Sequence, residues 1–268
     1  MHYNNMVAIF VDIIGYKNTT DFDQKYELHR LFHEEVAIHE ERQLDIPHVI
    51  YDRKVFGFSD CAFFFFYYKD GIEESRKDNT QLSYIAAYNV SLTILRLMEK
   101  GYLARGGLTF GEVFIDDLGF FGPAVERAHE IESKEAFFPR LQFDHDIGKK
   151  IYEWEHDLSN KDPALLDMYT DVPYVSEQED SSYFVNPFNV LQKSSELTVG
   201  SAETITLDSV KRSVLERADK DLIEYANNEK ITKKLEWIKK YTLSKPFLLK
   251  ESISPYSFSF MKAPNNVG

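Results

Sequence analysis

Residues 54–66 read KVFGFSDCAFFFF, and this stretch decides the fold. Apolar and aromatic residues stand on both sides of a short connection at residues 57–59, which contains a glycine and a serine. The pattern predicts a β-hairpin with strands over residues 48–57 and 60–68. The second strand opens with Asp60 and continues as a run of aromatic side chains, which is typical of a strand buried in a sheet.

Outward from the hairpin, strand and helix signals alternate. Residues 7–14 are rich in β-branched and aromatic side chains and predict a strand. Helices are expected over residues 25–42, 81–100 and 124–137, and a second pair of strands over residues 103–109 and 113–116, around Gly111. This order of elements predicts an α+β domain, in which a mainly antiparallel sheet carries its helices on one face.

The pattern changes in the last part of the chain. Residues 157–182 are acidic and irregular, and residues 183–188 are expected to return to the sheet as a strand. Two further helices are expected over residues 207–225 and 229–241. Because no repeat or low-complexity linker separates the parts, we expect a main domain over residues 1–150. A mostly helical C-terminal extension over residues 151–268 would pack on it.

Composition excludes several classes of protein. The 268 residues are 43% hydrophobic and 15% aromatic, which is enough for a sizeable core. With a formal net charge of −13, the chain repels phosphate backbones, so nucleic acid is not expected as a partner. The one cysteine, Cys61, forms no internal disulfide, which fits a cytoplasmic protein. No apolar run approaches the roughly 20 residues of a membrane span, so no membrane partner is expected.

Two aspartates interrupt apolar strands. Asp12 lies inside FVDIIGY at residues 10–16, and Asp60 opens the aromatic strand of the hairpin. Singly, each aspartate is explained equally well as a turn or strand-end residue. If the two strands are neighbours, both carboxylates reach one spot, where they suit a hard cation such as magnesium or manganese.

Four motifs in order resemble a known family. They are FVDIIGY, FGFSDCAFF, RGGLTFGEV and FFGPAVERAHEIES, and together they look like the class III nucleotide cyclase domain over about residues 6–142. The FSD at residues 58–60, RGGLTFGE at 105–112 and the stretch 121–140 are most similar to the pyrimidine nucleotide cyclases of bacterial Pycsar anti-phage systems.

The resemblance implies a reaction and its cofactors. In that family, UTP or CTP is cyclised with manganese, and the cyclic nucleotide activates a separate effector protein. Here it implies two Mn²⁺ (or Mg²⁺) ions per site, held by Asp12, Asp60 and the backbone carbonyl of Ile13. Uridylate cyclase activity, with cyclic UMP as product, is the first expectation and cytidylate cyclase the alternative. The family's sites lie between two chains, so a homodimer is implied.

The sequence departs from the wider family at its catalytic helix. Glu126 and Glu130 stand where other class III enzymes have an asparagine and a transition-state arginine. Arg105 is therefore the candidate residue for offsetting the negative charge on the α-phosphate. An ion pair with a carboxylate such as Glu112 explains it equally well. The loss of both usual residues also favours an alternative function, a non-catalytic nucleotide sensor of the same fold.

The candidate base pocket lies on the first strand of the hairpin. Phe56 occupies the position of the lysine that reads adenine in adenylate cyclases, and an aromatic ring there stacks on a base instead. Tyr51, further up the strand, is a second candidate because the pyrimidine branch uses a tyrosine in this region. Its alternative is a core tyrosine with a bonded hydroxyl.

Overall fold

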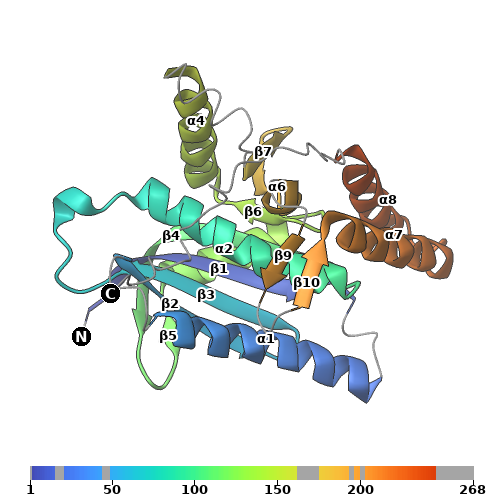
Figure 1. Ribbon diagram of the computed structural model, residues 1–268, viewed down its shortest axis with the longest axis horizontal. Coiled ribbons are helices and arrows are strands. Elements are labelled where there is room, and N and C mark those ends of the chain that lie inside the picture. The colour runs from blue at the N-terminus through green and yellow to red at the C-terminus, as the bar shows by residue number, and fades with distance from the viewer. Residues whose placement is uncertain are drawn as a thin grey trace, which may run out of the picture.

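A computed structural model describes residues 2–15, 21–43, 49–161, 175–192, 196–199 and 203–245. The strands are β1 (Asn4–Ile13), β2 (Tyr51–Phe58), β3 (Cys61–Tyr68), β4 (Ala104–Ile115), β5 (Phe120–Phe121), β6 (Leu141–Phe143), β7 (Ser176–Glu179), β8 (Ser182–Val185), β9 (Glu196–Val199) and β10 (Glu203–Thr206). The main sheet has the order β2-β3-β1-β4-β6-β8-β7, with β5 paired to β4 and a separate β9–β10 pair (Figure 1). Among the strands of the described residues, only β4 and β6 pair in parallel, so the expected mainly antiparallel sheet is confirmed.

Helices lie on both faces of this sheet. They are α1 (Phe22–Gln43), α2 (Asn79–Glu99), α3 (Pro123–Glu130), α4 (His145–Lys161), α6 (Phe188–Gln192), α7 (Leu207–Glu224) and α8 (Glu229–Ser244), with a short 3₁₀ turn at Glu74–Arg76. On one face, α1 and α2 share a core cluster with β1 and β3. On the other face, a smaller cluster includes α3. The expectation of helices on one face only is therefore wrong.

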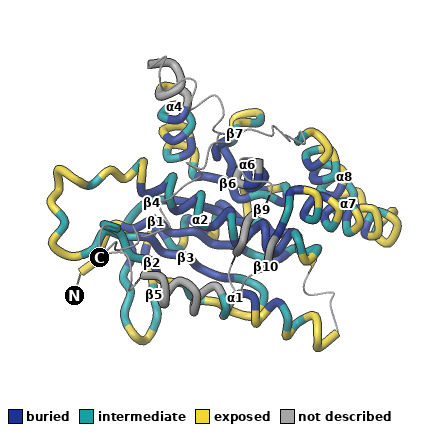
Figure 2. Tube along the Cα trace, viewed as in Figure 1, coloured by how far each residue is buried: buried dark blue, intermediate teal, exposed yellow. Residues whose placement is uncertain are grey.

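The alternation of side chains along β1 defines the two faces. Val7, Ile9 and Val11 join the cluster under α1 and α2, whereas Ala8 and Phe10 join the cluster under α3. Because successive side chains of a strand point to opposite faces, Asp12 belongs to the α3 face. Figure 2 shows the central strands buried along most of their length, since both of their faces are covered.

Several elements differ from expectation in detail. The strand pair expected around Gly111 is one continuous strand, β4, because Gly111 stays in register opposite Met6 of β1. The helix expected over residues 124–137 is α3 followed by a π-helical turn, η3 (Ile131–Glu135). The hairpin turn is formed by Ser59 and Asp60, one residue later than expected. Helix α4 was not expected at all.

The C-terminal part shares the sheet and the core of the rest. The boundary expected after residue 150 falls inside α4, and β8 pairs with β6 as the expected returning strand. Helices α7 and α8, both expected, contribute Val214 and Ile238 to the large core cluster. Part of the stretch expected to be irregular, residues 162–174, lies outside the described residues. None of the helices in the described ranges combines the length and hydropathy that a bilayer crossing requires.

Candidate functional site

The two sequence-predicted aspartates lie at neighbouring strand ends. β1 pairs antiparallel with β3, and Asp12 stands opposite Cys61 in this register. The backbone N–H of Ile13 donates to the carbonyl oxygen of Asp60 over 3.0 Å, which joins the end of β1 to the hairpin turn. Ser59 makes this turn possible by adopting φ 50°, a left-handed conformation that is uncommon outside glycine. The fold thus brings both aspartates to one corner of the sheet, with Asp12 on the α3 face.

The negative charges of this corner act on the thiol of Cys61. Burial first, and then the charges of Asp12, Asp60 and Glu132 in that order, together raise the pKa of the Cys61 thiol to about 11. A thiolate at Cys61 would face three carboxylates, so the thiol stays protonated. Glu132, on η3, was not singled out from the sequence, where nothing separates it from the other glutamates of the same motif.

Arg105 lies beside Asp12 and is held by Glu132. In the β1–β4 ladder, Arg105 stands opposite Asp12. Its Nε donates to Glu132 Oε1 over 2.7 Å, and its Nη2 donates to the same oxygen. The Glu132 side chain is only 5% exposed. The ion pair considered for Arg105 thus exists, with buried Glu132 as its partner in place of Glu112.

The two candidate base-pocket residues are separated by the sheet. Phe56 lies on the α3 face, where its ring contacts Phe120 at 4.8 Å between centroids. Tyr51 packs against the core on the opposite face. A side-chain hydrogen bond with Asn89 of α2 lowers the pKa of its hydroxyl, but burial outweighs this and raises the pKa. Five residues along a strand reverse the face, so Tyr51 cannot join Phe56 and Asp12 in one pocket of this chain, a correction to the expected pocket.

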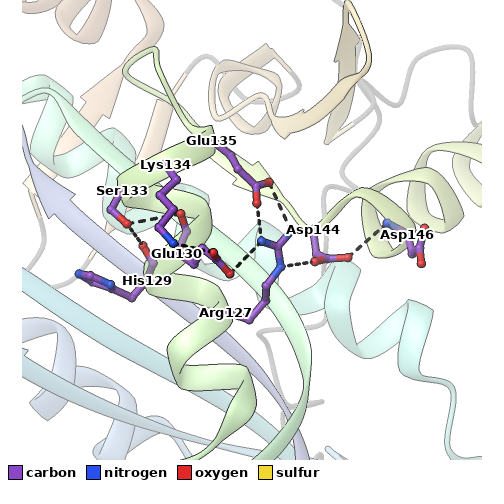
Figure 3. Close-up of polar contacts among 8 residues, drawn as sticks. All are labelled: Arg127, His129, Glu130, Ser133, Lys134, Glu135, Asp144 and Asp146. Carbon is purple, nitrogen blue, oxygen red and sulfur yellow. Dashed lines mark hydrogen bonds and ion pairs between the residues drawn. The ribbon is translucent and has the colours of Figure 1, made fainter.

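Glu130, one of the two glutamates singled out on this helix, belongs to an ion-pair network, shown in Figure 3. Glu130 accepts from Lys134 over 2.9 Å, and this bond lowers its pKa. Arg127 donates to Asp144 over 2.8 Å and to Glu135. Because Asp144 follows β6 directly, the network ties α3 and η3 to the end of that strand. Glu130 is therefore used in a local surface contact.

The donor set at the corner fits a hard cation. Asp12 and Asp60 supply carboxylates from adjacent strand ends, and the backbone of Ile13, which follows Asp12, is bonded to that of Asp60. Within the described part of the chain, no group of three or more His, Cys, Asp and Glu side chains is arranged to hold a metal by itself. A cation here would therefore complete its shell with phosphate oxygens and water, as magnesium commonly does.

Comparison with known proteins adds little beyond this geometry. No protein-family model matches the sequence, and a search of curated proteins finds no match. Among solved structures, the chain is similar to a bacterial light-regulated adenylyl cyclase, with 15% sequence identity and a TM-score of 0.38. The match covers 56% of this chain and 46% of that one, so the chain spans less than half of its length. So distant a likeness assigns no activity to this chain.

Proposed function

We propose that this chain is a nucleotide cyclase, which converts a nucleoside triphosphate into a cyclic nucleotide and pyrophosphate. The observation that carries the proposal is the position of Asp12 and Asp60, joined by the bond from Ile13 N to Asp60 O at 3.0 Å. After burial, the charges of both residues help to raise the pKa of Cys61 to about 11. Two carboxylates at one corner of a sheet suit a nucleotide with its metal ions.

Each residue of the corner has a role in this proposal. Asp12, Asp60 and the carbonyl of Ile13 would hold two Mn²⁺ or Mg²⁺ ions. Such ions activate an attacking hydroxyl and stabilise a departing phosphate. Arg105 donates N–H groups to an oxygen of the α-phosphate. A guanidinium has five N–H donors and Glu132 accepts from two nitrogens, so donors remain for the substrate.

The proposed substrate is a pyrimidine triphosphate, UTP before CTP. The half-buried ring of Phe56 supports a site that stacks on a base, because it replaces a lysine that would donate to adenine. The choice of uracil, and a role for cyclic UMP in activating an effector during anti-phage defence, come from the sequence resemblance alone. Tyr51 has no part in the proposed pocket.

We also propose that the active unit is a homodimer. An aromatic side chain is exposed next to the hairpin turn of the corner, since Phe58 is 49% exposed. Phe58 contacts Phe120, which in turn contacts Phe56 and Phe63 on the α3 face. Exposed aromatic groups that continue an apolar surface are typical of protein interfaces.

The test is product analysis with each of the four common ribonucleoside triphosphates and Mn²⁺, using chromatography and mass spectrometry. We expect cyclic UMP and pyrophosphate from the wild type and none from Asp60→Asn. Asp146→Asn, which changes a side chain 86% exposed on α4, is the matched control and should keep full activity. Cyclic AMP or cyclic GMP as the sole product would contradict the pyrimidine assignment.

The second candidate is a non-catalytic nucleotide sensor. It is favoured by Glu130, which stands where a catalytic arginine would be expected and makes a surface contact with Lys134. It predicts that calorimetry detects binding of a nucleoside triphosphate while no cyclic product forms with any of the four substrates. That pair of results would replace the cyclase proposal.

A further inference from the structure

Helix α8 is anchored next to the candidate site. The indole ring of Trp237 stacks on Phe138 with 4.9 Å between ring centroids. The guanidinium of Arg140 lies over both rings, 5.6 Å from Trp237 and 5.5 Å from Phe138. The carbonyl of Arg140 accepts from the N–H of Gly106 over 3.1 Å. The segment that anchors α8 is thus bonded to β4 one residue after Arg105.

One turn before Trp237, α8 carries Lys234, whose charged form is disfavoured by its surroundings. Lys234 Nζ lies 5.3 Å from the centroid of the Phe137 ring. Burial lowers the pKa of Lys234, and the positive charges of Arg105 and Lys230 lower it further, while Glu132 opposes them. A cation that is partly buried and close to another cation is disfavoured in the chain by itself. The Phe137 ring and the charge of Glu132 offset part of this cost, and an anion bound nearby would offset more of it.

Helix α7 brings a second cation to the other side of the Asp12 strand. Arg217 Nη2 lies 3.8 Å from the place where a Cβ on Gly15 would stand. Gly15 follows the end of β1 and adopts φ +82°. Arg217 Nε donates to Asp221 over 2.6 Å, which fixes the direction of the side chain. Figure 1 shows α7 and α8 together at the end of the sheet at which β1 ends.

Three cations from separate elements therefore lie around the end of β1. Arg105 of β4 stands opposite Asp12, Lys234 of α8 interacts with Arg105, and Arg217 of α7 lies beside Gly15. The chain as a whole has a net charge of −13, so a general surplus of positive charge does not account for them. Lysine and arginine are the side chains that hold phosphate groups in proteins. Cations around a carboxylate-bound metal suit a ligand with several adjacent phosphates.

We propose that Lys234 and Arg217 bind the polyphosphate of the nucleotide at the Asp12–Asp60 corner. The C-terminal helices are then part of the active site, because they supply cations in addition to Arg105 of the motif-bearing part. The inference deepens the proposed function, since it names residues for the same site. It rests on nucleotide binding there and does not require cyclisation.

The test measures binding of inorganic tripolyphosphate with Mn²⁺ to the full chain by isothermal titration calorimetry. Lys234→Gln and Arg217→Gln should each weaken the affinity about tenfold, the loss expected for one charge-assisted hydrogen bond. Lys233→Gln on α8 and Arg212→Gln on α7 are matched controls, because both side chains are exposed in the same helices. These controls should bind as the wild type does. Lys234→Gln should also keep or raise the melting temperature, since it removes a disfavoured charge.

Each outcome decides the inference. Wild-type affinity in Lys234→Gln and Arg217→Gln, equal losses in the controls, or no binding of tripolyphosphate by the wild type would overturn it. A loss of affinity in Lys234→Gln that accompanies a large loss of stability would mark Lys234 as structural and would also overturn it. If tripolyphosphate binding depends on both residues but no triphosphate is cyclised, the inference stands and the cyclase proposal fails. If cyclisation proceeds with an unchanged KM in both variants, the cyclase proposal stands and this inference fails.

Discussion

The buried carboxylate of Glu132 holds the guanidinium of Arg105, with 2.7 Å from Arg105 Nε to Glu132 Oε1. The pair spans β4 and η3 and lies beside Asp12, so it links the packing of the π-helical turn to the position of the proposed phosphate-binding arginine. The side chain of Arg105 is 20% exposed and that of Glu132 is 5% exposed. Loss of either partner leaves a partly buried charge without its counter-ion.

We therefore expect Glu132→Leu and Arg105→Met each to reduce the free energy of unfolding by about 3 kcal/mol. In each variant the remaining charge is buried without the counter-ion that compensates for its lost hydration. The double variant should lose clearly less than the sum of the two, as measured by urea denaturation. The exposed pair Lys149–Glu153 is the control, and its removal should cost about 0.5 kcal/mol at most. Additive losses in the Arg105 and Glu132 variants would show that the two side chains do not interact in solution.

The close approach of α3 to β4 depends on Gly107. A Cβ at this position would lie 2.2 Å from the carbonyl oxygen of Ala128 and 2.7 Å from Cβ of Ile131. Gly107→Ala should therefore push α3 and η3 away and destabilise the fold by about 1–3 kcal/mol, as overpacking usually does.

The matched control lies on the same strand. A Cβ at Gly111 would meet Cβ of Ala124 at 3.4 Å, an ordinary contact, so Gly111→Ala should leave the thermal unfolding midpoint close to that of the wild type. Equal shifts of the midpoint in Gly107→Ala and Gly111→Ala would be inconsistent with the packing of α3 on β4.

Cys61 is a reporter of charge at the candidate site, because it is the chain's one cysteine. In metal-free protein its pKa is about 11, raised by burial first and by Asp12 and Asp60 next. Asp60→Asn removes one negative charge, so the pKa should fall while burial keeps it above its ordinary value. At pH 8 more thiolate is then present, and alkylation by iodoacetamide should be faster than in the wild type.

Asp52→Asn, on the same hairpin, is the control for this measurement, since Asp52 is not among the charges that raise the pKa of Cys61. The alkylation rate should be followed from pH 7 upward. A wild-type thiol that titrates near its ordinary pKa of 9.0 would mean that the carboxylates do not converge at Cys61.

The proposed dimer predicts that a charged residue in place of Phe58 weakens self-association of the chain. This side chain is 49% exposed, so Phe58→Asp should leave the folded chain stable while placing a charge in the interface. Sedimentation velocity should then show a monomer at concentrations where the wild type is a dimer. Ile223→Asp changes a residue that is 82% exposed on α7 and should leave the dimer intact. A wild type that is monomeric throughout this range would remove the dimer from the proposal.

The sequence by itself determined the elements that carry the two aspartates. Apolar and aromatic runs predicted the β1 strand and the hairpin, because both faces of β1 and of the second hairpin strand, β3, are buried and the pattern is therefore local and strong. Asp12 and Asp60 stood out because each interrupts such a run. The period of two along a strand was also sufficient to place Tyr51 and Phe56 on opposite faces, although the sequence interpretation put them in one pocket.

Only the tertiary structure decided which partners meet at the corner. Glu132 lies 27 residues from Arg105, and Lys234 lies more than 100 residues from it, so no local period relates them. Their meeting depends on the parallel pairing of β4 with β6, which places the end of η3 and the anchor of α8 beside the start of β4. A sequence pattern reports which face of an element is apolar, whereas contacts between distant elements follow from packing of the whole core.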